Sequence, residues 1–298
     1  MFKVKILKTI CEQDMNEAHA KINIVLDVTG IRPDGYHEVK MIMQELSLHD
    51  DVTVTKLPGE EITITVHGGA ADIPADSRNI AVKAALLMKK TFGIPGGFHI
   101  DLIKRIPSAA GLAGGSADAA AVMKAVNALC SLGKTDRELS ELSAVIGADV
   151  PYCILGGTAL SEGIGEILRE LPPMRNVPVL LVKPAEGVST KEIYTSLDAV
   201  FDTVHHPDVE ACMEDIAAGD LRALRRHTGN VLEEVTPGKV PAVREIEEFL
   251  YTSGAELSMM SGSGPTVFGI FETEEELSEA MKKAGAAFPG CEILGTST

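Results

Sequence analysis

A glycine-rich segment over residues 107–118 carries the clearest chemical signal in the sequence. Its small side chains leave consecutive backbone N–H groups open to a ligand. An alternating, strand-like run over 98–103 precedes it, and an amphipathic stretch predicts a helix from the segment to about Leu132. Free amides at a helix N-terminus bind anions, so the segment predicts a phosphate site. A tight turn that packs a helix on a sheet has the same composition, and the segment alone leaves this alternative open.

The side chains of Ser116 and Asp118 suit the first helical turn, where their oxygens would accept from free amides. Two common nucleotide loops do not fit. A P-loop ends in Gly-Lys-Ser/Thr, and the one Gly-Lys-Thr in the chain, at 133–135, has Ala128 where the first loop glycine belongs. The dinucleotide spacing G-x-G-x-x-G is also absent. The expected phosphate-binding residues are Pro107, Ser108, Ala109, Ala110, Gly111, Leu112, Ala113, Gly114, Gly115, Ser116 and Ala117.

Two further places bring polar side chains together. Residues 20–28 alternate as a strand that buries one face, and Lys21 and Asn23 project together from the other face. Alternation alone favours a solvated face for this pair. Asp149 stands between a predicted helix end and Pro151, which is typical of a turn residue.

The elements that would position these residues mix strands and helices. A strand is predicted over residues 3–7, and a polar turn or excursion away from the sheet over 8–18. Residues 32–35 predict a turn. Further strands are expected, as is a helix from Asn79 to Phe92 that Gly93 stops. A capping box at Thr135 starts another helix, which we expect to end at Gly147 and Ala148. The further strands of this half are predicted over 39–48, 51–55, 61–66 and 156–160.

The second half begins after a proline-rich run at 171–173. A strand over 177–183 leads to a helix that carries Tyr194, and a strand–loop–strand unit surrounds the glycine-rich residues 261–265. Strands mixed with helices on one side indicate an α+β sandwich of the ferredoxin-like kind. The remaining elements are helices near 208–218, 220–227 and 240–252, a helix from Glu274, and a last strand near Glu292.

Length and composition describe an ordinary globular protein. The 298 residues suit one large or two medium domains, and 45% are hydrophobic. A net charge of −16 argues against general affinity for nucleic acid or an anionic membrane. No run is long enough for a membrane span, and no signal-peptide core is found. Five scattered cysteines predict reduced, mostly buried thiols in a cytoplasmic protein, and the eight histidines show no spacing typical of metal ligands.

Five stretches in order carry a resemblance to a known family. They are Ala-Lys-Ile-Asn at 20–23, Arg-Pro-Asp-Gly-Tyr-His at 32–37, the 107–118 segment, Gly-Ala-Asp-Val-Pro at 147–151 and Ser-Gly-Ser-Gly-Pro-Thr at 261–266. Together they resemble the GHMP kinases, and within them the branch that phosphorylates diphosphocytidyl methylerythritol in non-mevalonate isoprenoid synthesis. The resemblance implies an α+β fold with an N-terminal mixed-sheet domain over 1–163 and a C-terminal ferredoxin-like domain over 164–298.

The resemblance also implies roles for named residues. Asp149 would be the proton acceptor and Lys21 its cationic neighbour, with Asn23 hydrogen bonding to the substrate or to Asp149. The 107–117 loop would hold the phosphates of ATP, with Ser116 near Mg²⁺ and adenine near Asn79. Cytosine would lie between two tyrosines while a histidine reads its polar edge. The residues expected around cytosine are Tyr36, His37 and Tyr194.

Two alternatives remain at this point. Another GHMP kinase, such as a homoserine kinase, would share the loop, although the 35–37 and 147–151 stretches argue against it. A nucleotide-binding regulator would keep the fold without turnover, although it would have no need of both Lys21 and Asp149. In each case the partner is a small molecule, and the chain is expected to be a monomer or a homodimer.

Overall fold

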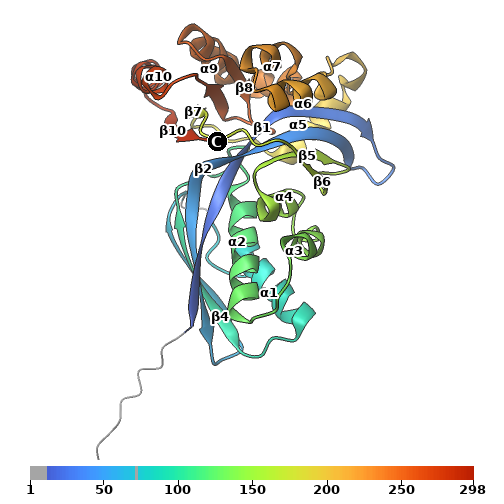
Figure 1. Cartoon of the computed structure of the whole chain (residues 1–298), viewed down its shortest axis with the longest axis vertical. Coiled ribbons are helices and arrows are strands. Elements are labelled where there is room, and N and C mark those ends of the chain that lie inside the picture. The colour runs from blue at the N-terminus through green and yellow to red at the C-terminus, as the bar shows by residue number, and fades with distance from the viewer. Residues whose placement is uncertain (1–11, 71–72) are drawn as a thin grey trace, which may run out of the picture.

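The computed structural model describes residues 12–70 and 73–298. Two sheets with their helices form two halves, and the long strands β1 (Gln13–Ile31) and β2 (His37–Leu57) pass along the junction between them (Figure 1). None of the helices in the described part has the length and apolar character needed to cross a membrane.

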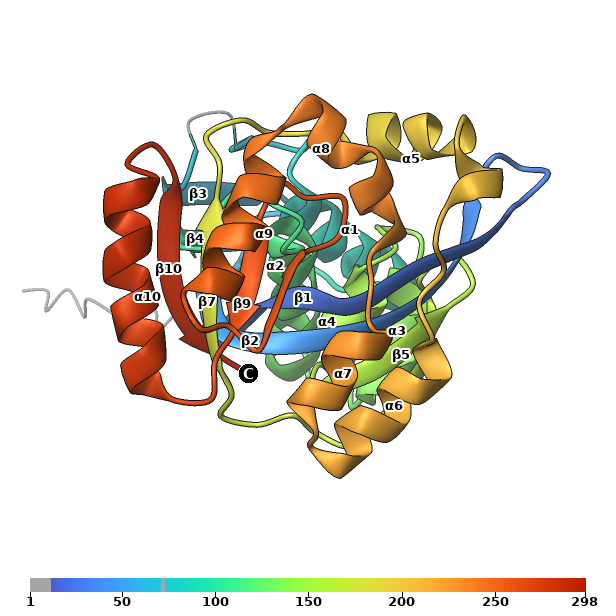
Figure 2. The same ribbon diagram turned by 90° about the horizontal axis from the view of Figure 1, so that it is seen from above.

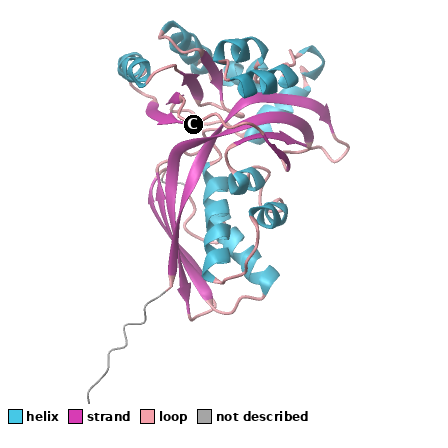
Figure 3. Cartoon of the chain, in the orientation of Figure 1, coloured by secondary structure: helices cyan, strands magenta, loops and turns pink. Residues whose placement is uncertain are grey.

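The first sheet has six strands. Its order is β3-β4-β2-β5-β6, with β1 pairing with β2, and only β3 and β4 run parallel. Alternate residues such as Ala18, Val52 and Ile100 form its buried face, and the helices of this half cover that face only (Figure 3). The other strands are β3 (Ile62–Gly68), β4 (Gly97–Lys104), β5 (Thr158–Glu162) and β6 (Ile167–Glu170).

Four helices belong to this half, and local chemistry sets their ends. The Asn79 side chain caps α1 (Ile80–Phe92), and Gly93 ends it in the left-handed conformation. The capping box at Thr135 begins α3 (Asp136–Ser143). Alanines along α2 (Gly114–Leu129) let it pack closely against the sheet and α1. The last of the four is the short α4 (Val150–Leu155).

The second sheet is fully antiparallel with the order β10-β7-β9-β8. In chain order, helices lie between β7 and β8 and between β9 and β10. This is the βαββαβ arrangement of a ferredoxin-like domain, as predicted. Helices α9 and α10 lie over these strands (Figure 2). The strands are β7 (Pro178–Lys183), β8 (Leu257–Met260), β9 (Val267–Ile270) and β10 (Glu292–Ser297). The helices are α5 (Thr190–Asp198), α6 (Val209–Ala218), α7 (Leu221–His227), α8 (Thr236–Lys239), α9 (Ala242–Thr252) and α10 (Glu274–Ala287).

The two halves share a core. Ile22, Ile24 and Ile42 from the first sheet pack in one buried cluster with Leu181 and Phe268 from the second. The β1–β2 pair therefore belongs to both halves. The expected domain boundary at 163/164 falls in the turn between the paired strands β5 and β6, and it stays a prediction.

Several sequence predictions need correction. Residues 13–18 are not a polar excursion but the start of β1, because their pairing with 50–55 is continuous. The segments 39–48 and 51–55 are parts of one strand, β2. Helix α3 ends at Ser143, well before Gly147, and the unpredicted α4 follows Asp149. The predicted strand over 3–7 lies outside the described residues.

The prediction that the cysteines are mostly buried was wrong. The four cysteines that the structure describes are free thiols. Only Cys212 is buried, whereas Cys130, Cys153 and Cys291 are half-buried.

Candidate active site

A buried ion cluster holds the glycine-rich loop between β4 and α2 in place. The ammonium group of Lys104 lies between Asp50 and Asp118, 2.7 Å from Oδ2 of Asp118. The other oxygen of Asp50 accepts from the N–H groups of Arg105 and Ile106, the two residues that enter the loop. Burial raises the pKa of Asp118 to about 8, because the Lys104 charge only partly offsets desolvation and the Asp50 charge adds to it.

The loop leaves the helix amides free. Ala109, Gly111 and Ala113 are left-handed, and Ala113 is the N-cap residue of α2 without a side-chain hydrogen bond to the first turn. The expectation that Ser116 and Asp118 cap this helix was wrong, since Asp118 instead pairs with Lys104. The Ser116 hydroxyl makes no hydrogen bond to any residue that the structure describes. An uncapped helix N-terminus behind a glycine-rich loop fits a bound phosphate chain.

The loop touches the second glycine-rich segment, at 261–265. Gly111 has φ +74°, and a Cβ atom there would lie 2.1 Å from the Ser261 carbonyl oxygen. The Ser261 hydroxyl donates to the Gly111 carbonyl at 3.0 Å. Asn230, which the sequence did not single out, donates to the carbonyls of Met260 and Gly262 and so holds the second segment in place. Glycine is therefore required at 111 by contact as well as by conformation.

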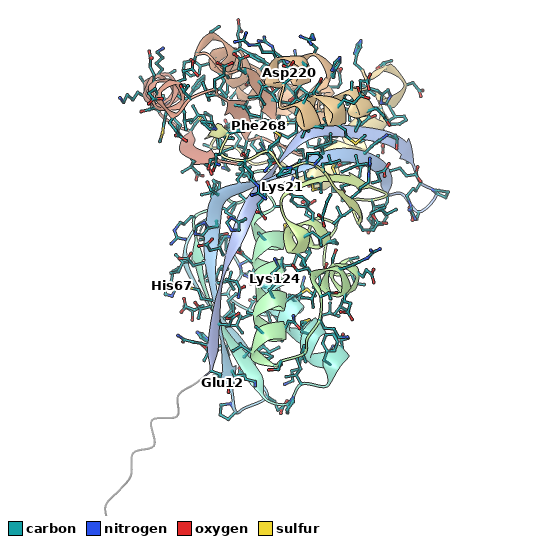
Figure 4. All side chains as sticks on the ribbon, viewed as in Figure 1. Glu12, Lys21, His67, Lys124, Asp220 and Phe268 are labelled. Atoms are coloured by element: carbon teal, nitrogen blue, oxygen red, sulfur yellow. The ribbon has the colours of Figure 1, made fainter. Side chains whose placement is uncertain are left out.

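Lys21 lies where these segments meet. Its ammonium group donates to Asn23 Oδ1 at 2.6 Å and to the Gly111 carbonyl at 3.1 Å, and the residue is 4% exposed. A Cβ atom on Gly262 would lie 3.4 Å from that ammonium group. Figure 4 shows Lys21 at the junction of the two halves. The polar strand face is therefore not solvated but buried at the candidate site.

Asp149 stands at the start of α4, half-buried, and its carboxylate has no hydrogen-bond or ion-pair partner among residues 12–70 and 73–298. Lys21 is not within ion-pair distance of it. Burial raises the pKa of the Cys153 thiol and the charge of Asp149 raises it further, whereas the charge of Lys21 lowers it. Both charges therefore act on the same thiol. Lys21 and Asp149 therefore lie in one region without an ion pair between them.

The residues expected around cytosine also lie close together. The His37 and Tyr194 rings are in contact, with centroids 4.9 Å apart. His37 Nε2 lies 2.7 Å from Asp198 Oδ1, so this nitrogen is the donor. Burial and then the charge of Asp149 raise the pKa of Tyr194, which places the tyrosine within electrostatic reach of the carboxylate. Tyr36 is 60% exposed in the β1–β2 turn and is not packed on the other rings.

Asn79 lies at the edge of this region. Both ends of its side chain hydrogen bond locally, to the Ala81 N–H and to the Pro74 carbonyl, so its visible role is the cap of α1. The neighbouring Ile80 lies 3.4 Å from a Cβ atom built on Gly115. The start of α1 therefore borders the glycine-rich loop.

The model of the GHMP kinase N-terminal domain matches residues 79–157, and that of the C-terminal domain matches residues 212–290. The chain therefore belongs to the GHMP kinase family, and it is a phosphotransferase. Two similar proteins carry the name 4-diphosphocytidyl-2-C-methyl-D-erythritol kinase. That of Geobacillus thermodenitrificans is 48% identical, over 88% of this chain and 89% of its own. That of Clostridium botulinum is 47% identical, over 90% of this chain and 94% of its own.

The solved structures agree. A crystal structure of 4-(cytidine 5'-diphospho)-2C-methyl-D-erythritol kinase covers 95% of this chain and 98% of its own, with 32% identity and a TM-score of 0.80. A homoserine kinase from Cytophaga hutchinsonii has a TM-score of 0.77 at 18% identity. The second likeness shows the fold alone, so the comparisons favour the cytidine branch over a homoserine kinase.

Proposed function

We propose that this kinase transfers the γ-phosphoryl group of ATP to the 2-hydroxyl of 4-diphosphocytidyl-2-C-methyl-D-erythritol, a step of isoprenoid precursor synthesis. The observation that carries the proposal is the position of Lys21, whose buried ammonium group is held only by neutral oxygens beside both glycine-rich segments. A buried cation without an anionic partner is ready to stabilise charge on a transferring phosphoryl group.

Asp149 would orient the acceptor hydroxyl and take its proton late in the transfer. An ordinary carboxylate is a weak base towards an alcohol, so its main contribution is position. The separation from Lys21 supports this assignment, because a direct ion pair would block the hydroxyl from the carboxylate. Asn23 has a side-chain N–H directed only at the weak acceptor Met41 Sδ, at 3.4 Å, and can turn to the substrate.

The residues 107–117 would hold the phosphates of ATP through the loop amides and the free first turn of α2, with adenine beside Asn79. Mg²⁺ bound with those phosphates would neutralise part of their charge. Ser116 is the group that this chain offers it, because the hydroxyl is half-buried and has no protein partner.

Cytosine would be held by Tyr36, His37 and Tyr194. Because His37 Nε2 donates to Asp198, the Nδ1 atom of a neutral ring is left as an acceptor. An acceptor suits the exocyclic amino group of cytosine and opposes the carbonyl oxygen of uracil, so His37 would distinguish the two bases. Tyr36 would close over the base from the exposed turn.

ATP consumption by the purified protein tests the proposed reaction. We expect turnover with diphosphocytidyl methylerythritol and none above background with homoserine or phosphomevalonate. The Asp149→Asn variant should keep ATP affinity and lose turnover by at least about 100-fold. Turnover with homoserine alone would refute the substrate, and near-normal turnover of a folded Asp149→Asn protein would remove Asp149 from the chemical step.

Base recognition is tested separately. Tyr194→Ala should raise KM by about tenfold or more, because stacking contributes about 1–3 kcal/mol per base. Tyr194→Phe, which keeps the ring, is the matched control and should be nearly silent. His37→Ala should weaken the cytidine substrate more than its uridine analogue. An unchanged KM in Tyr194→Ala would place the base elsewhere.

A further inference from the structure

The outer face of the first sheet, away from α1 and α2, carries a group of side chains that the proposed reaction does not use. His19 on β1 is paired directly with His49 on β2, and Glu17 is paired with Asp51. Residues two apart on a strand share a face, so the four side chains form a square on the same side of the sheet. His67, labelled in Figure 4, lies on this outer side too, while Lys124 lies on α2 behind the sheet.

The donor atoms of this square converge. His19 Nε2 lies 3.3 Å from one oxygen of Glu17, and His49 Nε2 lies 3.8 Å from the other. The donor atoms of Glu17, His19 and His49 all lie within 4.8 Å of one another. Asp51 Oδ1 is 3.5 Å from His49 Nε2. A tetrahedral ion with bonds of about 2.0–2.1 Å separates its ligand atoms by roughly 3.3 Å, which is close to these spacings.

Hydrogen bonds at Nδ1 orient both imidazole rings. His19 Nδ1 donates to the Leu46 carbonyl at 2.9 Å, and His49 Nδ1 donates to the Ser47 carbonyl at 2.8 Å. A carbonyl oxygen only accepts, so each neutral ring keeps its lone pair on Nε2, directed into the square. Histidines that bind metals have such a second hydrogen bond, which fixes the ring and its tautomer.

We propose that Glu17, His19 and His49 form a binding site for a divalent transition metal of the zinc class. Asp51 lies beside it, with Oδ1 3.5 Å from His49 and Oδ2 accepting from Arg105 at 2.6 Å. Two imidazoles with carboxylates favour Zn²⁺, Co²⁺ or Ni²⁺ over Mg²⁺ and Ca²⁺, which prefer oxygen ligands. The side chains of His19, His49 and Asp51 are one quarter to one third exposed, so an ion reaches them without opening the fold.

Histidine spacing along the sequence predicted no ligand set, and this expectation is revised. His19 and His49 are thirty residues apart in the sequence and become neighbours only because β1 pairs with β2. Between His49 and Asp51, Asp50 turns to the other face, where it holds the entry of the glycine-rich loop. A metal on the outer face would therefore fix the same stretch of β2 that anchors the loop on the inner face.

Calorimetric titration with Zn²⁺ alone tests the site, with Co²⁺ absorption as the spectroscopic readout. We expect one equivalent bound with a dissociation constant below about 100 μM, and no comparable binding of Mg²⁺. The Co²⁺ spectrum should be that of a nitrogen and oxygen site, without the sulfur charge-transfer band that a cysteine ligand adds. Saturating Zn²⁺ should raise the Tm by about 4 °C or more, because the ion binds only the folded pair of strands.

The single variant His49→Gln should weaken Zn²⁺ binding by at least about tenfold. The double variant, His19→Gln with His49→Gln, should abolish it. Glu17→Gln is a milder variant on an exposed side chain and should weaken binding without any loss of fold. His67→Gln is the matched control, a histidine of the same face outside the square, and should bind as the natural protein does. Absence of Zn²⁺ binding, or binding that survives the double change, would overturn the proposal.

Discussion

Two buried lysines, Lys21 and Lys104, lie on either side of the glycine-rich loop and have opposite surroundings. Lys104 contacts two carboxylates, whereas Lys21 contacts only an amide oxygen and a backbone carbonyl. The Lys104 charge is therefore neutralised by partners inside the fold. No carboxylate among residues 12–70 and 73–298 pairs with Lys21, whose charge faces the place where the two glycine-rich segments meet.

The difference distinguishes a lysine that stabilises the fold, Lys104, from a lysine whose charge is available to a ligand, Lys21. An ion cluster whose cation is paired inside the fold holds the backbone and leaves no free positive charge for a ligand. A desolvated cation with only neutral partners costs stability and is tolerated where an anionic substrate supplies the missing charge. The three experiments below test this comparison.

Replacing Lys104 by Met should have the largest effect on the fold. It leaves Asp50 and Asp118 buried without a cation, and breaking a buried pair costs about 3–5 kcal/mol. Urea unfolding should show this loss in the free energy of unfolding, together with weakened ATP binding because the loop entry loses its anchor. If Lys104→Met kept its stability, the cluster would not be structural and the comparison would fail.

Replacing Lys21 by Met should reverse the pattern. We expect turnover to fall by about 100- to 1000-fold, as for loss of one group that stabilises transition-state charge. The Tm should not fall, because removal of a desolvated charge offsets the two hydrogen bonds lost to neutral oxygens and the methionine keeps most of the side-chain volume. Steady-state kinetics with a thermal scan measures both, and a rise in KM alone would make Lys21 a binding residue only.

Asp118→Asn should have the smallest effect and a distinctive pH dependence. With a pKa of about 8 against an ordinary 3.8, folded Asp118 holds a proton that the unfolded chain releases. Its contribution to stability is therefore full below about pH 4, declines as pH rises, and is lost above about pH 8. The asparagine resembles the protonated form at every pH. Unfolding free energies should agree within about 1 kcal/mol at pH 4 and increasingly favour the variant towards pH 8.5.

A constant difference between wild type and Asp118→Asn across this pH range would mean that the Asp118 carboxyl is not protonated in the folded protein. Lys124→Met, on the same helix and outside the cluster, is the control for a general effect of changing α2. Its difference from wild type should not follow the same curve.

The sequence predicted those parts of the fold that depend on local chemistry. The stop at Gly93 and the capping box at Thr135 are set by residues within a few positions, so both were found correctly. The antiparallel second sheet followed from its strand and helix order. The start of β1 was missed because strands with one polar face and few buried side chains resemble loops in a single sequence.

The candidate site was predictable where a motif is continuous and not where the fold assembles it. The glycine-rich loop and the position of Asp149 are visible in short stretches. The cluster of Asp50, Lys104 and Asp118 joins positions 14 and 54 residues apart, and no spacing rule connects them. The same holds for the contact of His37 with Asp198, which decides which ring nitrogen accepts.

The strand order of the second sheet also governs how this protein emerges from the ribosome. Strand β7 is wholly buried, and both of its neighbours, β9 and β10, are made last. During synthesis its apolar residues must wait for nearly the whole remaining chain before they find a partner, and long-range pairing of this kind is slow. A chain stalled before residue 267 therefore exposes two unpaired strand edges, which makes it a substrate for chaperones and prone to aggregate.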